Sequence, residues 1–312
     1  MKKLLLVVAV SSLTVGSAHA VTVYEKGGFT YKLNGDFQIQ LRQDVGEDES
    51  ALVDFDDLEL KNYFSYDLSD NMKGFARVDF DFKDEANGED NVTPLEEAYV
   101  GLQYGAVSGS IGKQNFASDE FGVEEAYETP LDEDQFDAVE TSGDDTIRFE
   151  AELDNVFLVA TYELEAEGKG GTEGEFFDLF ASTEFGGLSL AAAYQQHTPI
   201  GSRSLDTFGV SAAYDFDIAT VAADYSVTDD GNTNRDTALY NLVASFDVTN
   251  TTGVAIGMQN QDEDGAEDVT GWYANVTYKF STQKNVSIFA ELADTDEDNS
   301  DIGYLAGFRV KF

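Results

Sequence analysis

Residues 32–42 read KLNGDFQIQLR, and their alternation decides the fold. Polar or charged side chains stand at every even position of this stretch, namely at Lys32, Asn34, Asp36, Gln38, Gln40 and Arg42. Leu33, Phe37 and Leu41 stand among the residues between them. A period of two over this length predicts a β-strand with one wet face and one apolar face.

The same pattern recurs to the end of the chain. Further strands are predicted at about 57–66, 76–83, 95–104, 107–116, 147–153, 156–164, 176–185, 188–196, 207–216, 218–227, 237–246, 251–261, 271–280, 284–293 and 302–312, which makes sixteen. Short turns alternate with longer, acidic loops between them. An even number of alternating strands with this loop pattern is typical of a transmembrane β-barrel. We therefore expect an all-β fold, an antiparallel 16-stranded transmembrane barrel.

A soluble β-sandwich is the alternative fold, because its strands also alternate. A barrel in a membrane needs an outer apolar band that ends in aromatic residues. Two strands supply such rows, namely Phe208, Val210, Ala212 and Tyr214 and then Trp272, Ala274, Val276 and Tyr278. Gly, Ser, Thr, Asn and charged residues alternate with them, which indicates a wet lumen and favours the barrel.

The first twenty residues have the form of a secretory signal peptide. Lys2 and Lys3 precede an apolar run, and Ala18-His19-Ala20 matches a cleavage site. We expect residues 1–20 to be removed and residues 21–312 to form the barrel domain. The chain has no cysteine, so disulfides cannot stabilise it.

The charge balance excludes one large class of partner. The chain carries 61 Asp and Glu against 18 Lys and Arg, a formal net charge of −43 at pH 7. Such a surface repels nucleic acid and favours cations. No segment after the signal peptide has the roughly 18 consecutive apolar residues that a transmembrane helix needs.

The longest connection follows Gly112-Lys113-Gln114 and extends to Asp145. Its acidic residues include Asp119, Glu120, Glu124, Glu125, Glu128, Asp132, Glu133 and Asp134, and residues 116–145 contain no Lys or Arg. Loops of this length are usually functional or disordered. Apolar residues from Phe116 to Val139 are spaced among the acids, which predicts an ordered loop that folds into the barrel.

In four stretches the chain resembles the general porins of Gram-negative outer membranes. These are Tyr31-Lys32-Leu33-Asn34-Gly35, Ala98-Tyr99-Val100-Gly101-Leu102, Gly112-Lys113-Gln114 and the final Phe312. The resemblance implies an outer-membrane homotrimer that passes small hydrophilic solutes and ions by passive diffusion. It also implies contacts with membrane lipids and the assembly machinery, with Phe312 as the assembly signal.

In that family the third loop narrows the pore opposite a cluster of wall arginines. The resemblance places Arg148 at one arginine position, Asp57 and Glu96 at others, and Asp36 where the family has a lysine. Arg42, Lys61 and Arg77 also have the parity of lumen residues. Together these residues are the expected pore wall. Because acids replace family cations, we expect the pore to prefer cations through an acidic constriction.

The sequence gives little support for an enzyme. After the signal peptide, His197 is the one histidine, and a hydrolase on this scaffold would need partners for it. Asp294, Asp296, Asp298 and Asp301 resemble a calcium loop but lack its glycine and its final glutamate. We expect no catalysis, no cofactor and no dedicated metal site. An acidic, non-channel surface adhesin or a soluble exported binding protein remains the alternative function.

Overall fold

The computed structural model describes residues 21–89, 93–131, 136, 141–164, 174–231 and 235–312. The predicted signal peptide lies outside these residues. The strands are β1 (Val21–Lys26), β2 (Phe29–Gln43), β3 (Leu52–Ser69), β4 (Met72–Asp81), β5 (Leu95–Tyr104), β6 (Val107–Asn115), β7 (Ser142–Leu153), β8 (Val156–Glu163), β9 (Glu175–Phe185), β10 (Leu188–Thr198), β11 (Leu205–Asp215), β12 (Thr220–Asp230), β13 (Arg235–Thr249), β14 (Thr252–Glu263), β15 (Val269–Phe280), β16 (Gln283–Thr295) and β17 (Gly303–Lys311). Two short helices, α1 (Lys83–Asn87) and η1 (Ala117–Glu120), lie in connections.

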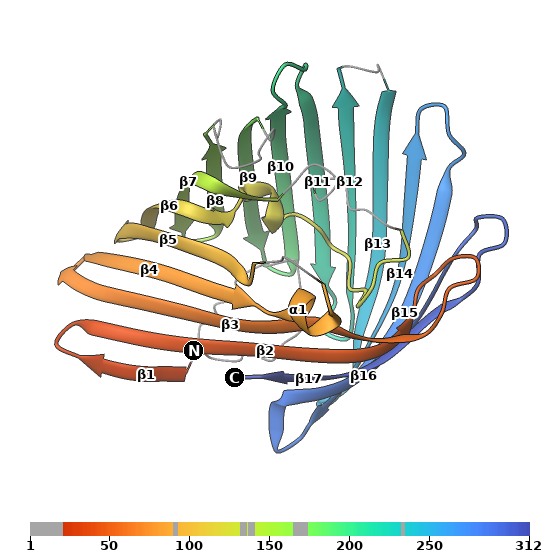
Figure 1. Ribbon diagram of the computed structural model, residues 1–312, viewed down its shortest axis with the longest axis horizontal. Coiled ribbons are helices and arrows are strands. Elements are labelled where there is room, and N and C mark those ends of the chain that lie inside the picture. Colours follow the sequence, from red (N-terminus) through yellow and green to blue (C-terminus); the bar gives the residue numbers. More distant parts are fainter. Residues whose placement is uncertain (1–20, 90–92, 132–135, 137–140, 165–173, 232–234) are drawn as a thin grey trace.

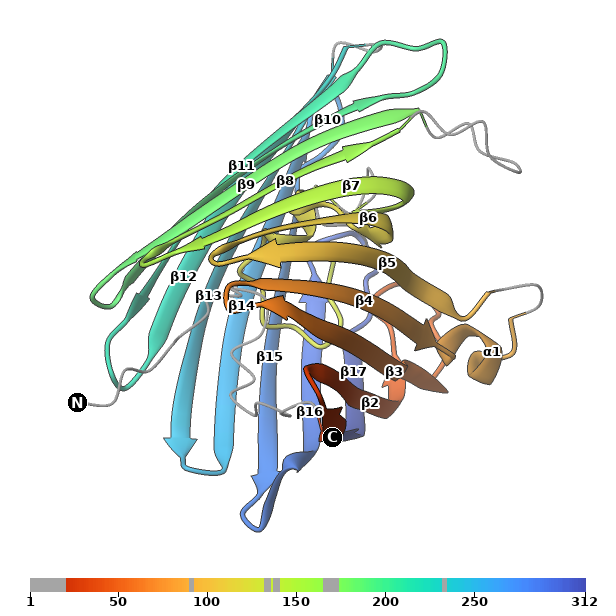
Figure 2. The same ribbon diagram turned by 90° about the vertical axis from the view of Figure 1, so that its left-hand side faces the viewer.

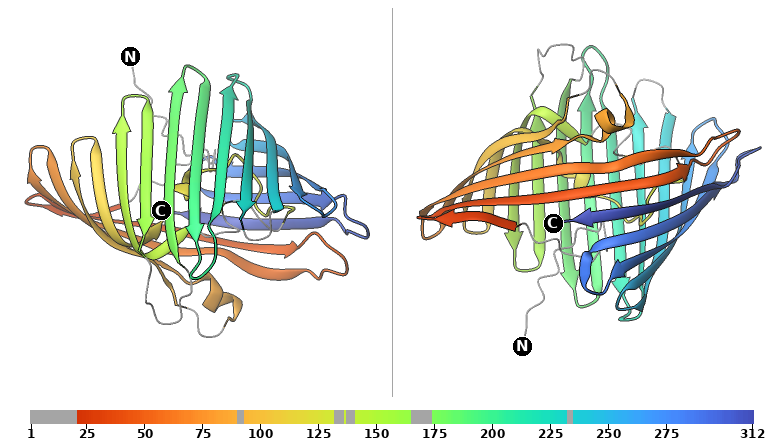
Figure 3. Two further views of the ribbon diagram at one scale, coloured as in Figure 1. Left: turned by 90° about the horizontal axis from the view of Figure 1, so that it is seen from above. Right: turned by 60° about the horizontal axis from the view of Figure 1, so that its bottom comes forward.

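Strands β2 to β17 form a closed antiparallel barrel. Each strand pairs with the next one along the chain, and β17 returns to pair with β2 over Asp36–Gln43. Figures 1 and 3 show this ring of strands around a central space. The expected 16-stranded barrel is confirmed.

Strand β1 is an additional element that the alternation did not predict, because it is only six residues long. It pairs with the start of β2, from Val21 opposite Leu33 onward. Strand β17 pairs with the rest of the same edge, so that β1 and β17 lie end to end beside β2 (Figure 1). Between them, Gly35 and Phe312 exchange two backbone hydrogen bonds of 2.9 and 3.0 Å.

The side chain of Phe312 packs on the outer face of this seam. A Cβ atom added to Gly35 would lie 2.3 Å from the Phe312 ring, so only glycine leaves room for it. The ring also meets Phe37 edge-on at 5.7 Å between centroids. The last residue therefore completes both the hydrogen bonding and the packing of the seam.

The two faces of the wall separate as the alternation predicts. On β11, Phe208 is 46% exposed on the outside, whereas its neighbour Thr207 is 1% exposed on the lumen side. On β15, Trp272 is 42% exposed and Tyr273 is 1% exposed. The outer apolar rows therefore face the membrane, and the polar positions face the lumen or the loop inside it.

The two ends of the barrel differ. Tight turns close one end, for example Gly186-Gly187 between β9 and β10, and longer connections gather at the other. Helix α1 forms in the connection after β4, where the sequence predicted only an acidic loop. The Asn87 side chain fixes it to β3 by hydrogen bonds with the backbone of Phe55, at 2.8 and 3.0 Å. Within the described ranges, no helix is long and apolar enough to cross a membrane.

Candidate pore constriction

The third loop connects β6 to β7, and its described residues 116–131, 136 and 141 lie inside the barrel (Figures 2 and 3). It begins with η1 pressed against the wall. The backbone amide of Ala117 donates to Thr161 Oγ1 at 3.0 Å, and Ser118 Oγ donates to Asp178 Oδ2 at 2.8 Å. Gln195 Nε2 donates to the same serine at 3.0 Å. The inward fold predicted from the spacing of apolar residues is confirmed.

Apolar side chains of the loop pack on a wall of small residues. Phe121 and Phe136 form a buried cluster with Val159, Phe180 and Ala193. The Phe121 ring fills the space at one wall glycine, since a Cβ atom on Gly209 would lie 2.6 Å from it.

The middle of the loop reaches the adjoining part of the wall. Val123 packs in a second cluster with Ala222, Val243 and Ala255 of β12, β13 and β14. Further along the loop, Pro130 lies over Gly271, where a Cβ atom would approach it to 2.7 Å. Glycine and alanine at these lumen positions therefore leave the room that the loop occupies.

Three polar side chains of β15 and β16 bind the loop backbone. Glu291 accepts hydrogen bonds from the amides of Tyr127 (2.8 Å) and Glu128 (3.0 Å). Asn275 Nδ2 donates to the carbonyl of Glu125 at 2.6 Å and to Glu291 at 3.0 Å. Tyr273 accepts from the amide of Glu125 at 2.7 Å. We call Tyr273, Asn275 and Glu291 the loop clamp.

The acidic residues of the loop have different surroundings. Glu120 forms an ion pair with Arg148 at 2.6 Å, and Glu128 pairs with Arg42 and accepts from Gln40. Glu124 caps the loop locally, accepting from the Val123 amide at 3.0 Å, and Glu125 is half-buried beside it. Asp119 is exposed and accepts from Asn115 at 2.7 Å. The predicted constriction residues Asp132, Glu133 and Asp134 lie outside the described residues.

The Glu120 carboxyl lies in a confined site. Burial raises the pKa of Glu120 above its ordinary value, and the attraction of Arg148 opposes that rise. The same guanidinium donates to the carbonyls of Asn115 and Phe116, both at 3.0 Å, and to Glu150 at 2.7 Å. Arg148 thus anchors the start of the loop and also neutralises charge there.

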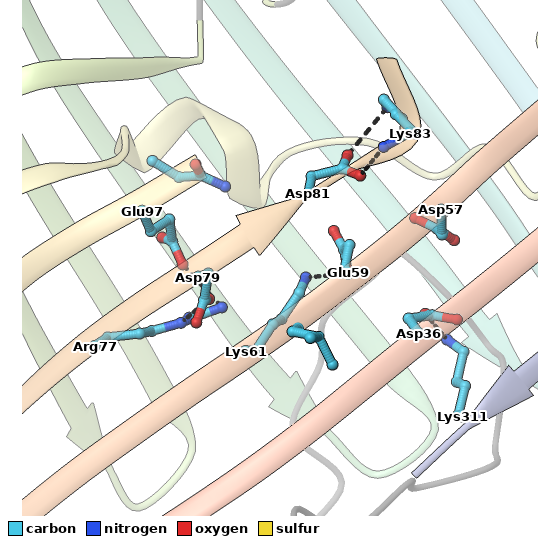
Figure 4. A network of polar contacts seen from close by, with 12 residues as sticks. Asp36, Asp57, Glu59, Lys61, Arg77, Asp79, Asp81, Lys83, Glu97 and Lys311 are labelled. Carbon is cyan, nitrogen blue, oxygen red and sulfur yellow. Dashed lines mark hydrogen bonds and ion pairs between the residues drawn. The ribbon is translucent and has the colours of Figure 1, made fainter. Parts of the chain in front are cut away.

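The predicted wall residues other than Arg148, which lies on β7, come together on β2 to β5, where cations and acids alternate (Figure 4). Lys61 pairs with Glu59 at 2.7 Å. Arg77 pairs with Asp79 and, at 2.8 Å, with Glu97. Glu96 stands half-buried at the start of β5. Lys61 and Arg77 of this wall segment are therefore each bound to a neighbouring carboxylate.

Comparison with known proteins identifies the architecture. The family model described as "Gram-negative porin" matches residues 6–300. The chain belongs to the Gram-negative porin family. Like the family, this porin is an outer-membrane channel for passive diffusion.

Individual relatives are distant but span the whole length. The porin is 26% identical to "Porin-like protein H" of Photobacterium profundum, with both chains covered completely. It is 24% identical to the "Monosaccharide porin" of a Halomonas species over all of this chain and 76% of that one. The trimer form of the Vibrio cholerae outer membrane protein OmpT has a TM-score of 0.76 at 20% identity, covering 92% of this chain and all of the other.

Two basic residues of the porin's wall were missed by sequence reasoning. Arg309 binds Asp36 through two bonds of 2.8 and 2.5 Å and Asp57 at 2.8 Å, and Lys311 binds Asp36 at 3.1 Å. The alternation along β17 could have predicted both residues. Phe308 and Phe312 face outward, so Arg309 and Lys311 face the lumen. The two acids expected on the wall, Asp36 and Asp57, are therefore neutralised from the neighbouring strand.

Asp36, Asp57 and Glu59 form a carboxylate cluster whose oxygens lie within 4.8 Å of one another. That spacing could suit a metal ion. Arg309 and Lys311 already bind this cluster, and Lys61 binds Glu59. We therefore interpret the cluster as an ion-pair network and assign no metal to it.

Other carboxylates of the lumen are held by neutral donors, and these too were missed from the sequence. Asp56, at a bulge of β3, accepts from the Gln38 amide. Asp178 accepts from Ser118 and Gln195, and Glu291 is bound by Asn275 and loop amides. Such partners orient a carboxylate without cancelling its charge.

His197 lies at the end of β10 with its ring stacked on Phe176, 4.0 Å between centroids and 6° between planes. Phe176 in turn packs on Phe116 at the start of the third loop. The histidine therefore helps to support the loop from the wall.

The loop clamp gives the first prediction. Replacing Glu291 by Ala removes the acceptor of two loop amides, and each such hydrogen bond to a charged group is worth roughly 1.5–3 kcal/mol. We expect the amides of Tyr127 and Glu128 to exchange hydrogen at least tenfold faster, measured by mass spectrometry on the folded protein in detergent. Glu291→Gln keeps one acceptor oxygen and should have an intermediate effect. Unchanged exchange in Glu291→Ala would show that packing alone holds the loop.

Proposed function

We propose that this porin prefers cations, and that carboxylates of the third loop and the adjoining wall produce the preference. The supporting observation is the pairing of the wall cations. Among the described residues, the basic side chains Arg42, Lys61, Arg77, Arg148, Arg309 and Lys311 each contact at least one carboxylate within 3.4 Å. A positive wall able to attract anions is therefore not available at these positions.

The remaining charge is negative. An ion pair has a weak field at the distance of a passing ion, whereas neutral hydrogen-bond donors supply no positive charge to offset that of an ionised carboxylate. Asp56 and Glu291 are held in this way, at the wall and under the loop. The screening length is about 8 Å at physiological ionic strength, so carboxylates that line one narrow passage add their potentials. Rings of Asp and Glu select cations in pores by this means.

The competing function is an acidic surface adhesin that conducts nothing. Such a protein has no need for a lumen loop held by Arg148 at its start and by the loop clamp at residues 125–128. Stepwise ohmic conductance of the purified protein in a planar bilayer supports the channel. Silence from demonstrably folded protein would favour the adhesin.

Charge selectivity gives the second prediction. Replacing Glu120, Glu124, Glu125 and Glu128 jointly by Gln should lower the potassium-to-chloride permeability ratio severalfold, measured from reversal potentials in a salt gradient. The substitution removes four negative charges and leaves Arg42 and Arg148 with fewer partners. The matched control neutralises four acids of the β14–β15 connection and its flank, Asp262, Asp264, Glu267 and Asp268, and should change the ratio little. Equal losses in both variants would place the selecting charge outside the constriction.

The pH dependence gives the third prediction. Because burial raises the pKa of Glu120, this carboxyl binds a proton at a higher pH than an ordinary glutamate with a pKa of about 4.3. Protonation removes one negative charge and frees part of the Arg148 guanidinium. Cation selectivity should therefore begin to fall, as pH is lowered from 7, before ordinary glutamates titrate. Glu120→Gln should remove this first part of the decline, and a variant with an unchanged profile would contradict the assignment.

The fourth prediction is that the porin forms a homotrimer, as the Vibrio cholerae protein does. The outer faces of β4 and β5 carry small residues such as Gly74, Ala76 and Ala98, which allow two barrels to approach closely. Beside them, Val100 and Leu102 are each 58% exposed. Cross-linking in native membranes should yield trimers, and a product that is only monomeric would refute the proposal.

A further inference from the structure

An unusual row of side chains crosses the lumen wall between the constriction and the short-turn end. The strand register places Lys32 of β2 opposite Tyr63 of β3, Tyr63 opposite Arg77 of β4, and Arg77 opposite Tyr99 of β5. Phe75 lies next to them on β4, one lumen position nearer the turn. We call these five residues the lumen row.

The three rings of the lumen row form one aromatic surface. Tyr63 and Phe75 are 6.2 Å apart between centroids with planes inclined by 23°, and Phe75 meets Tyr99 edge-on at 6.3 Å. Phe75 lies against Gly101, where a Cβ atom would come within 2.3 Å of its ring. All three rings keep partial exposure, although they face the lumen and not lipid. Aromatic surface left accessible in a water-filled passage often marks a binding site.

Hydrogen-bonding groups of both kinds border these rings. Arg77, between the two tyrosines, pairs with Asp79 and, at 2.8 Å, with Glu97 (Figure 4). Lys61, one lumen position before Tyr63 on β3, pairs with Glu59 at 2.7 Å. The Lys32 ammonium lies 5.9 Å from the centroid of the Tyr63 ring. A ligand on the row would find flat apolar faces, cationic donors and carboxylate acceptors together.

Three ligand classes fit this chemistry poorly. An anion would have to displace the carboxylates that already bind Arg77 and Lys61. Organic cations compete with Lys32 and Arg77, which already lie beside the tyrosine rings. A wholly apolar solute gains nothing from the charged groups and would have to displace their water. A neutral ligand with one apolar face and many hydroxyls satisfies all of the groups.

We propose that the lumen row is a low-affinity binding site for a neutral saccharide. The C–H face of a pyranose ring would stack on Phe75 and the tyrosines, while its hydroxyls would accept from Arg77 and Lys61 and donate to the neighbouring carboxylates. Low affinity suits a channel, because a permeating solute must also leave. The proposal does not depend on cation preference, since the ligand carries no charge.

The test measures current block by maltose through the full-length porin in a planar bilayer. Wild type should show a saturable fall in conductance that an equal mass concentration of polyethylene glycol of similar size does not reproduce. Phe75→Ala should weaken the apparent affinity about fivefold to tenfold, the effect of losing one aromatic stacking contact. The matched control is Phe64→Ala on the same strand as Tyr63, because Phe64 stacks on Tyr31 on the outer face at 4.8 Å. Phe64→Ala should leave the block unchanged.

Two results would overturn the proposal. One is a wild-type conductance that falls with maltose no more than with polyethylene glycol. The other is a block that Phe75→Ala, or Phe75→Leu if the alanine variant does not fold, leaves unaltered. Reversal potentials recorded in the same bilayers report on cation preference separately, so failure of either proposal can be told from failure of the other.

Discussion

The structure depends on the closure of the backbone hydrogen-bond ring between β17 and β2. In hydrocarbon an unpaired backbone group costs several kcal/mol, so a membrane sheet cannot leave an open edge. Strand β17 is too short to cover the whole edge of β2, because its pairing stops at Asp36. Phe312 continues it to Gly35, and β1 covers the edge from Leu33 to Phe29. The short first strand and the last residue are thus two parts of one seam.

Closure forces every second side chain into the lumen, and the third loop divides that lumen unevenly. The loop packs along β8 to β16, where the wall offers Ala193, Gly209, Ala222 and Ala255. The lumen face of β2 to β5 instead carries long charged and aromatic side chains. The open passage therefore lies between a loop-covered half and a charged half. The position of the loop accounts for both sets of residues. Small residues lie where the loop packs, and large residues lie where it leaves the wall uncovered.

The alternation in the sequence predicted most of the fold but only part of the site. A period of two assigns each residue to a face, which is why the sixteen strands and the lumen positions of Arg42, Lys61 and Arg77 could be predicted. The partner of each residue depends on the register between strands, and bulges such as the one at Asp56 shift that register. The alternation of polar and apolar residues does not show where such a bulge lies. The contacts of Arg309 with Asp36 and Asp57 join residues more than 250 positions apart. Glu291 of the loop clamp binds backbone amides of the loop. Because every residue but proline has such an amide, the sequence does not show which of them Glu291 binds.

The two halves of the passage differ in the partners that hold their carboxylates. On the β2–β5 wall, cations from neighbouring strands stand within 3.1 Å of Asp36, Asp57 and Glu97, so these positions present alternating charges. Beneath the loop, Glu291 and Asp178 Oδ2 accept hydrogen bonds from amides and a hydroxyl, which stabilise a carboxylate without supplying positive charge. The proposed cation preference therefore draws on carboxylates with neutral partners, at Asp56 on the wall and at Glu291 beneath the loop. The charged wall of β2 to β5 would affect a solute only at short range, through direct hydrogen bonds.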